Sequence, residues 1–119
     1  MYSEDDRSLD WLEHIIENSD RIASYLAGLG LEEFAGDSKT RDAVERCIER
    51  ITEAAIRLGP DRLAAIAPEV PLRQVRGLGN ILRREYDRVN PELIWDTVKN
   101  EVPALRQACD AALRARGER

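Results

Sequence analysis

The segment Thr40–Pro60, TRDAVERCIERITEAAIRLGP, indicates how the whole chain folds. Its apolar residues recur at every third and fourth position, which is the spacing of one face of an α-helix. A Gly-Pro pair then ends the pattern, as it commonly ends helices. We therefore expect a helix over residues 39–58, with Asp37 or Ser38 as its N-cap. The expected inward residues are Ala43, Val44, Cys47, Ile48, Ile51, Ala54, Ala55 and Leu58.

The residues on the N-terminal side of this segment show the same helical spacing. They predict a helix over residues 5–27. Gly28 and Gly30 should end this helix, because glycine readily adopts the backbone conformation that closes a helix. We expect a short loop or turn to follow and to place Phe34 in the core.

Two further helical segments are predicted on the C-terminal side. Residues 61–66 are expected to form a short helix, and residues 72–87 a longer one. Gly79 should lie elsewhere on the longer helix than its inward face, where a glycine would allow a partner to approach closely. The inward residues expected there are Val75, Leu78, Ile81 and Leu82.

The last helical pattern has a strong start signal, with Asn90 as N-cap and Pro91 at the first helical position. Pro103 must kink or interrupt this helix, because it lacks an N–H and clashes with the preceding turn. Together the segments predict an all-α fold. We expect an antiparallel up-down bundle of four to five helices, with a kinked last helix, as one domain over residues 1–119. The inner face expected for the last helix is Leu93, Ile94, Trp95, Val98 and Val102.

Composition excludes several classes of protein. The chain has 119 residues, 43% of them hydrophobic, which is too apolar for a disordered chain. Its net charge of -5 argues against a protein that coats nucleic acid over its whole surface. No apolar run approaches the roughly 20 residues that span a bilayer. The N-terminus is acidic and polar, unlike a signal peptide, so we expect a cytoplasmic protein with no membrane contact.

The two cysteines, Cys47 and Cys109, predict no metal site. They lie in apolar helical patterns and lack the close spacing of zinc ligands, so reduced thiols in the core are expected. No cofactor or metal is predicted. The only histidine, His14, is expected at the surface or its boundary. Glu53 has two open interpretations: an exposed carboxylate, or a carboxylate near the core that an arginine of residues 72–87 neutralises.

The segment Val75–Arg88, VRGLGNILRREYDR, concentrates the candidate functional residues. From Arg73 to Arg88 the chain has five arginines against Glu85 and Asp87, a local balance of +3 on an acidic protein. A solvated helix face and a phosphate-binding surface both remain possible explanations. The Gly-x-Gly pattern is not a dinucleotide-binding motif, because leucine occupies the third glycine position and no strand precedes it. The arginines that would bind RNA or phosphate are Arg73, Arg76, Arg83 and Arg84.

Several blocks of the chain resemble HepT-like proteins of the HEPN superfamily, the toxins of HEPN/MNT toxin–antitoxin modules. The resemblance runs from about residue 9 to residue 113. SYLAGLGLEEFAGD is followed by TRDAVERCIERITEAA, which is similar to the family block "daverrLeiIGEAa". The VRGLGNIL segment comes next. LIWDTVKNEVPAL is similar to the family's "vW.iv...lp.L".

The family signature R-N-x-x-x-H-x-Y aligns with the same segment. Asn80 and Tyr86 match the Asn and the Tyr, whereas Gly79 occupies the Arg position and Arg84 the His position. The resemblance implies a homodimer in which Arg and His of two subunits face each other in a metal-independent ribonuclease site. It also implies that a nucleotidyltransferase antitoxin transfers AMP to Tyr86 and silences the toxin. Catalysis is thus assigned to positions 79, 80 and 84.

The two departures predict impaired catalysis. Gly79 offers no positive group, and Arg84 cannot act as a general base because its guanidinium stays protonated. Arg84 could still bind a phosphate by a bidentate contact. Two origins are open: a naturally degenerate homologue, or an inactivated version of a toxic parent. The alternative function is a non-catalytic module that binds nucleotide, RNA or a partner protein, and a structural helical dimer without a ligand ranks last.

Overall fold

The computed structural model describes residues 4–84 and 90–118, although the side chains of residues 4–6, 72, 83 and 84 lie outside the description. All regular structure in these ranges is helical, which confirms the all-α prediction. A π-helical segment, η2 (Thr97–Glu101), joins the last two α-helices. The α-helices are α1 (Glu4–Leu26), α2 (Leu31–Gly36), α3 (Ser38–Leu58), α4 (Pro60–Ile66), α5 (Leu72–Arg84), α6 (Pro91–Asp96) and α7 (Val102–Ala115).

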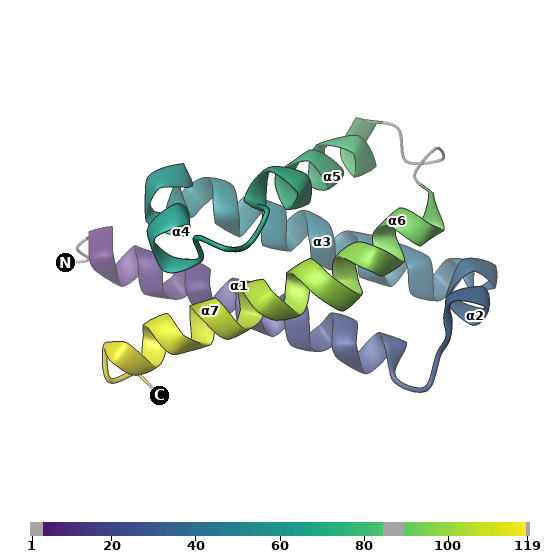
Figure 1. The fold of residues 1–119 in the computed structure, drawn as a ribbon, viewed down its shortest axis with the longest axis horizontal. Helices are drawn as coiled ribbons and strands as arrows, with labels where there is room; N and C mark the ends of the chain where they lie inside the picture. The colour runs from purple at the N-terminus through teal and green to yellow at the C-terminus, as the bar shows by residue number, and fades with distance from the viewer. Residues whose placement is uncertain (1–3, 85–89, 119) are drawn as a thin grey trace.

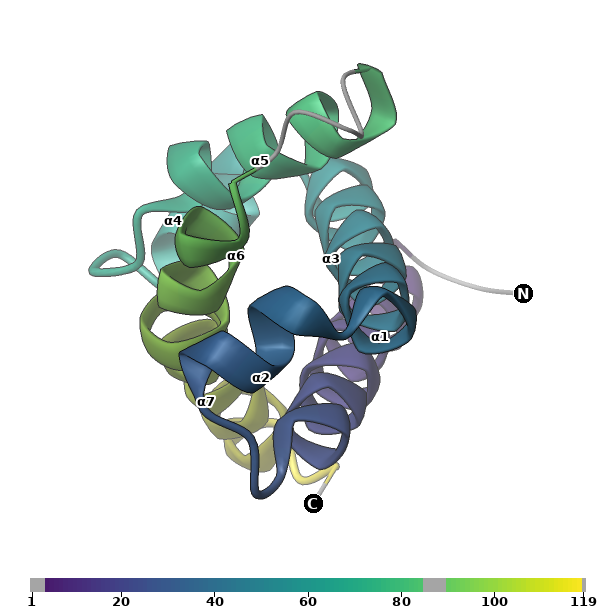
Figure 2. The same ribbon diagram turned by 90° about the vertical axis from the view of Figure 1, so that its right-hand side faces the viewer.

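Four long helical segments make up the bundle: α1, α3, α5 and the continuous segment α6–η2–α7 (Figure 1). Successive segments run in opposite directions, as expected for an up-down bundle with short connections. The two short helices lie at opposite ends, with α4 near the start of α5. The end-on view shows α2 across the opposite end of the bundle (Figure 2). The core therefore forms between the four long helical segments.

The buried residues follow the helical spacing read from the sequence. In α3, for example, Val44, Ile48, Ile51 and Ala55 are all at most 3% exposed. Phe34 is fully buried, and its ring centroid lies 5.5 Å from that of Trp95. The prediction that Phe34 enters the core is thus confirmed, although residues 31–36 form a short helix rather than a loop.

Two predicted N-caps are present. The Asp37 carboxylate accepts a hydrogen bond of 3.1 Å from the backbone N–H of Thr40, at the start of α3. Hydrogen bonds from the Thr40 hydroxyl and backbone lower the pKa of Asp37, because they stabilise the charged form. At the start of α6, Asn90 accepts a bond of 2.8 Å from the backbone N–H of Glu92. Both caps satisfy backbone donors that would otherwise lack helical partners.

Two apolar residues predicted to face inward are instead exposed. Ile81 of α5 is 43% exposed and Leu93 of α6 is 49% exposed. Each lies one position before a residue that is buried, Leu82 and Ile94 respectively. A step of one residue turns a helical side chain by roughly 100°, so neighbouring apolar residues cannot share the centre of the buried stripe.

Pro103 interrupts the last helix through the π-helical segment that precedes it. The backbone N–H of Val102 donates to the carbonyl of Thr97, five residues earlier, instead of the usual four. Pro103 follows directly, near the start of α7, and the π-helical segment accommodates its missing N–H within a helix that otherwise continues. The predicted interruption is therefore present, and the chain continues as helix beyond it.

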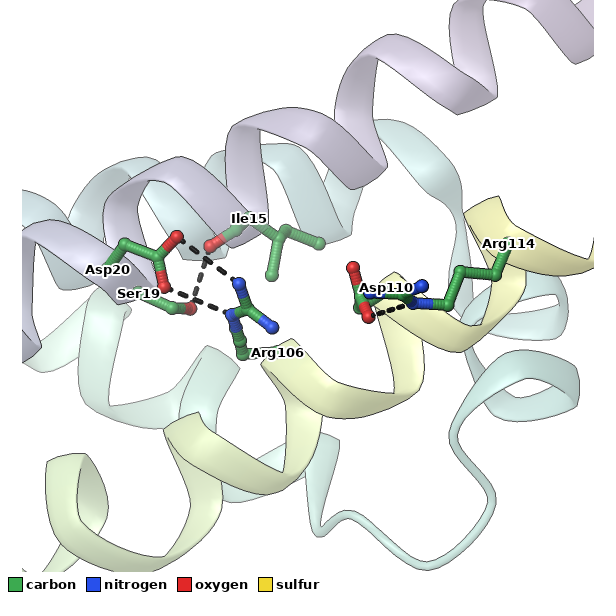
Figure 3. A network of polar contacts seen from close by, with 6 residues as sticks. All are labelled: Ile15, Ser19, Asp20, Arg106, Asp110 and Arg114. Atoms are coloured by element: carbon green, nitrogen blue, oxygen red, sulfur yellow. Dashed lines mark hydrogen bonds and ion pairs between the residues drawn. The ribbon is translucent and has the colours of Figure 1, made fainter. Parts of the chain in front are cut away.

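A surface ion pair ties α1 to α7 (Figure 3). Arg106 Nε lies 3.0 Å from Asp20 Oδ1, and Nη2 lies 3.4 Å from Asp20 Oδ2, a two-pronged contact. The hydrogen bond to Asp20 raises the pKa of Arg106. Among the described residues, no helix has the length and apolar character needed to cross a bilayer.

Candidate functional site

Helix α5 carries the candidate site, and one edge of it packs against α3. Val75, Leu78 and Leu82 are at most 4% exposed, and Gly79 is also buried. These positions share one side of the helix because they are three or four residues apart. Gly79 is therefore part of the inward face of α5.

The position of Gly79 contradicts the expectation that it lies away from the bundle. A Cβ atom added at this position would lie 2.7 Å from both Cβ and Cγ2 of Thr52, and closer still to Thr52 Oγ1. Real Cβ atoms do not approach other heavy atoms so closely. The glycine thus allows α5 and α3 to approach each other closely within one chain. It does not provide the close contact with a second subunit that the sequence predicts.

The Thr52 side chain is fixed in one position on α3. It is fully buried, and its hydroxyl donates to the carbonyl of Ile48 at 2.8 Å, one turn earlier in the same helix. The same oxygen lies 3.4 Å from the carbonyl oxygen of Val75 on α5. Its side chain therefore lies directly against the turn of α5 that ends at Gly79.

The other glycine of α5 has different surroundings. A Cβ added at Gly77 would meet nothing within 4 Å, and Gly77 is only half-buried. A glycine in an exposed helix costs about 1 kcal/mol relative to alanine. Packing between helices explains Gly79, and nothing in the structure explains Gly77.

The predicted RNA-binding residues lie partly within the described structure. Arg73 and Asn80 are exposed, and Arg76 is half-buried, on the part of α5 that does not face α3. Arg83 and Arg84 form the last turn of α5, but their side chains lie outside the described residues. Tyr86 also lies outside them.

Two other residues singled out from the sequence have ordinary surroundings. Glu53 is 46% exposed and pairs with Arg57 in its own helix, at 3.1 Å, as the exposed interpretation expects. His14 is exposed on α1, and its ring centroid lies 5.5 Å from that of Trp11.

A second basic surface surrounds Trp11, at the end of the bundle where α3 meets α4. Arg57 lies 5.6 Å above the Trp11 ring, and a groove of about 410 Å³ beside it is lined in part by Arg7 and Arg62. Arg57 also pairs with Glu53, and Arg62 donates to the Ser8 hydroxyl. Arg57 and Arg62 therefore have partners within the protein, and α5 remains the better candidate for an RNA surface.

Cys47 and Cys109 are free and buried. Burial raises the pKa of both thiols, that of Cys109 to about 12. A thiol with so high a pKa is almost entirely protonated near neutral pH, and the thiolate is the reactive form. Neither cysteine is suited to be a nucleophile.

Thr52 is absent from the site residues that the sequence predicts. One signal could have found it. The family block that residues 42–55 resemble reads IGEA where this chain reads ITEA, so the block has glycine at the position of Thr52. The chain therefore differs from the family pattern at both members of one contact, positions 52 and 79.

Comparisons with known proteins point to one family. The sequence profile described as ribonuclease HepT-like matches residues 15–112. The chain is 33% identical over 97 residues to a protein of Thermococcus cleftensis named "Probable ribonuclease HepT", covering 82% of this chain and 87% of that protein. It is 37% identical over 93 residues to a provisionally named RNase of Methanocaldococcus jannaschii, covering 78% and 76% of the two chains. No solved structure matches it at a significant level.

Proposed function

We propose, from the premise that this chain belongs to the ribonuclease HepT-like family, that it is the HepT-type component of a HEPN/MNT toxin–antitoxin module. In this proposal it is a single-domain, cytoplasmic homodimer that binds RNA. A nucleotidyltransferase antitoxin transfers AMP to its Tyr86. The chain itself is impaired in RNA cleavage.

One observation carries the proposal of impaired cleavage: the contact between position 79 and Thr52. Cleavage by an internal 2′-hydroxyl needs a group that accepts its proton and a positive group that stabilises the developing charge on phosphate. Position 79 has neither a charge nor space for a side chain, because a Cβ there would lie 2.7 Å from Thr52 Cβ. Arg84 stays protonated and cannot accept the proton.

The exposed part of α5 supports retained RNA binding. Arg73 is exposed there and Arg76 is half-buried beside it, and guanidinium groups can bind phosphate through two parallel hydrogen bonds. This is also the observation that favours the second candidate function, a non-catalytic module that binds nucleotide, RNA or a partner. The two candidates differ in whether an antitoxin recognises and modifies the chain.

Exposed apolar residues support the proposed dimer. Ile81 and Leu93 are 43% and 49% exposed, and they lie on α5 and α6, on either side of residues 85–89 in the chain. An apolar surface patch that included both residues would be typical of a protein interface. A two-fold interface on α5 and α6 would cover both of them and would bring two copies of the signature segment near each other.

Mass spectrometry after co-expression with a minimal nucleotidyltransferase of the MNT type, taken from the same genome, tests the toxin–antitoxin proposal. We expect one adenylyl group on the wild-type chain, located by peptide mapping at Tyr86, and none on the Tyr86→Phe variant. Tyr25→Phe is the matched control, because Tyr25 is 41% exposed on α1 and is not part of the signature segment. An unmodified wild-type chain, or modification that survives Tyr86→Phe, would contradict the proposal.

Fluorescence anisotropy with labelled single-stranded RNA tests the binding surface. We expect Arg73→Gln combined with Arg76→Gln to weaken binding and to reduce the salt dependence by about 0.7 per lost phosphate contact. Arg46→Gln is the control, because this exposed arginine lies on α3, where it pairs with Glu49 of the same helix. Equal binding by the α5 and α3 variants would place the RNA elsewhere.

A further inference from the structure

The contact between Thr52 and position 79 limits what residue 79 can be. The Cβ atom of Thr52 is fixed by the backbone of α3, and a Cβ at position 79 would be fixed by the backbone of α5. Their separation of 2.7 Å therefore cannot be relieved by turning either side chain. Only a shift of one helix, or the loss of the side chain at position 52, would make room.

We infer that Thr52 is a positioning residue. Its side chain fills the space beside position 79 of α5 and so excludes every residue except glycine there. In this view Thr52 and Gly79 are a matched pair. The arginine that the family signature has at position 79 can return only when residue 52 is also glycine. The catalytic meaning of this inference depends on the proposed function, whereas the steric coupling does not.

The environment of Thr52 explains why its side chain cannot move away from position 79. Its side chain is fully buried, with the hydroxyl bound to the Ile48 carbonyl at 2.8 Å. Buried side chains in closely packed interiors do not move into new positions without cost, because few voids exist to receive them. Overpacking at this point would instead push α5 away from α3.

The pair also bears on the two open origins of the sequence. If an arginine at position 79 had been replaced recently by glycine, its stem would leave an unfilled space beside α3. Here the Thr52 side chain occupies the space that a Cβ at position 79 would need. This complementarity favours natural divergence, in which both positions changed, over a single inactivating substitution.

The first experiment compares alanine at the two glycines of α5 in the full-length protein. Gly77→Ala should raise the thermal midpoint by about 3–6 °C, because alanine favours helix and nothing lies within 4 Å of the added Cβ. Gly79→Ala should lower the midpoint by roughly 5 °C or more, despite the same gain in helix propensity. Equal midpoints for the two variants would overturn the inference.

A double-mutant cycle then shows whether Thr52 is the cause. In a Thr52→Gly background, Gly79→Ala should no longer lower the midpoint relative to Thr52→Gly alone. In a Thr52→Val background it should still do so, because valine keeps the shape of threonine and removes only the hydroxyl. If Thr52→Val relieves Gly79→Ala as well as Thr52→Gly does, the hydroxyl and its hydrogen bonds are responsible, and the steric inference is wrong.

The functional experiment compares Gly79→Arg/Arg84→His with the triple variant that adds Thr52→Gly. Cleavage of single-stranded RNA is measured in EDTA, at a temperature where circular dichroism finds both variants folded. We expect the triple variant to cleave the RNA about 100-fold faster than the double variant. This is the factor typical of one group that stabilises charge in the transition state. Equal cleavage by both would overturn the role of Thr52.

The alanine cycle separates the two claims if cleavage is absent. A folded triple variant that does not cleave RNA, together with the expected thermal coupling, would contradict the proposed ribonuclease function and leave the Thr52–Gly79 pair established. A failed thermal cycle would contradict the pair, whatever the cleavage result. If the double variant does not fold and the triple variant does, the pair is supported directly.

Discussion

At the scale of single residues, the meaning of Gly79 depends on a neighbour from another helix. The segment around it predicts a missing arginine through its resemblance to the family signature. The structure adds that this position faces α3 and is closed by Thr52. No property of residues 75–88 alone could predict this, because the contact joins positions that are 27 residues apart. A glycine in the matching family block was the available signal.

The cysteines give a residue-scale prediction about reactivity. Burial raises the pKa of Cys109 to about 12, so at about pH 8 roughly one thiol in 10,000 is ionised in the folded protein. We expect neither Cys109 nor Cys47 to react with iodoacetamide in the native protein within an hour, and both to react fully in guanidinium. Peptide mass spectrometry measures the extent at each site. Rapid labelling of either cysteine in the native protein would contradict the prediction and show that the core around α3 or α7 opens readily.

At the scale of helices, the sequence predicts the existence and boundaries of the long helices α1 and α3 well, whereas it misses the short helix α2. The ends of α1 and α3, the caps at Asp37 and Asn90, and the interruption near Pro103 all depend on local chemistry, so local sequence predicts them. The side that each residue faces is less certain. Ile81 and Leu93 adjoin buried residues, and only the packing of neighbouring helices decides which of two adjacent apolar residues is covered.

The N-cap of α3 gives a prediction that depends on pH. The folded-state pKa of Asp37 lies below its ordinary value of 3.8, so the carboxylate stabilises the fold at pH values above that value. This stabilisation is lost as the pH falls through the folded-state pKa. We therefore expect Asp37→Ala to lower the urea midpoint at about pH 7, and the difference from wild type to shrink at about pH 3.

Asp37→Asn is the matched control for the charge. Asparagine is also a good N-cap but does not titrate, so this variant should stay close to wild type at about pH 7. Its difference from Asp37→Ala should be the same at both pH values. A wild-type advantage over Asp37→Ala that grows in acid would mean that another group is responsible.

At the scale of the whole molecule, the fold places helix α5, which carries the described part of the signature segment, at one edge of the bundle. Helix α5 covers α3 with one side and leaves Arg73, Asn80 and Ile81 exposed. Membership in the ribonuclease HepT-like family rests on sequence similarity over residues 15–112, and the all-α bundle agrees with the expected fold. Quaternary structure could not be derived from helical periodicity, because an interface and a solvated face can have the same spacing.

The proposed homodimer predicts a specific effect of surface charge. Ile81→Glu and Leu93→Glu should each convert the dimer to monomer at micromolar concentration, because a buried unpaired carboxylate is costly at an interface. Ile56→Glu is the matched control: Ile56 is 42% exposed, but it lies on α3. Light scattering coupled to size-exclusion chromatography measures the mass. A wild-type monomer, or a dimer disrupted only by Ile56→Glu, would contradict an interface on α5 and α6.

We propose that this chain keeps the fold of a HepT-like ribonuclease while positions 79 and 84 do not support cleavage. The most direct test incubates the purified wild-type protein with labelled single-stranded RNA in EDTA and resolves the products on a denaturing gel. The Thermococcus cleftensis relative serves as a comparison. We predict that the wild-type chain binds the RNA and leaves it intact. Metal-independent cleavage by the wild-type chain, abolished by Arg84→Ala, would contradict the account.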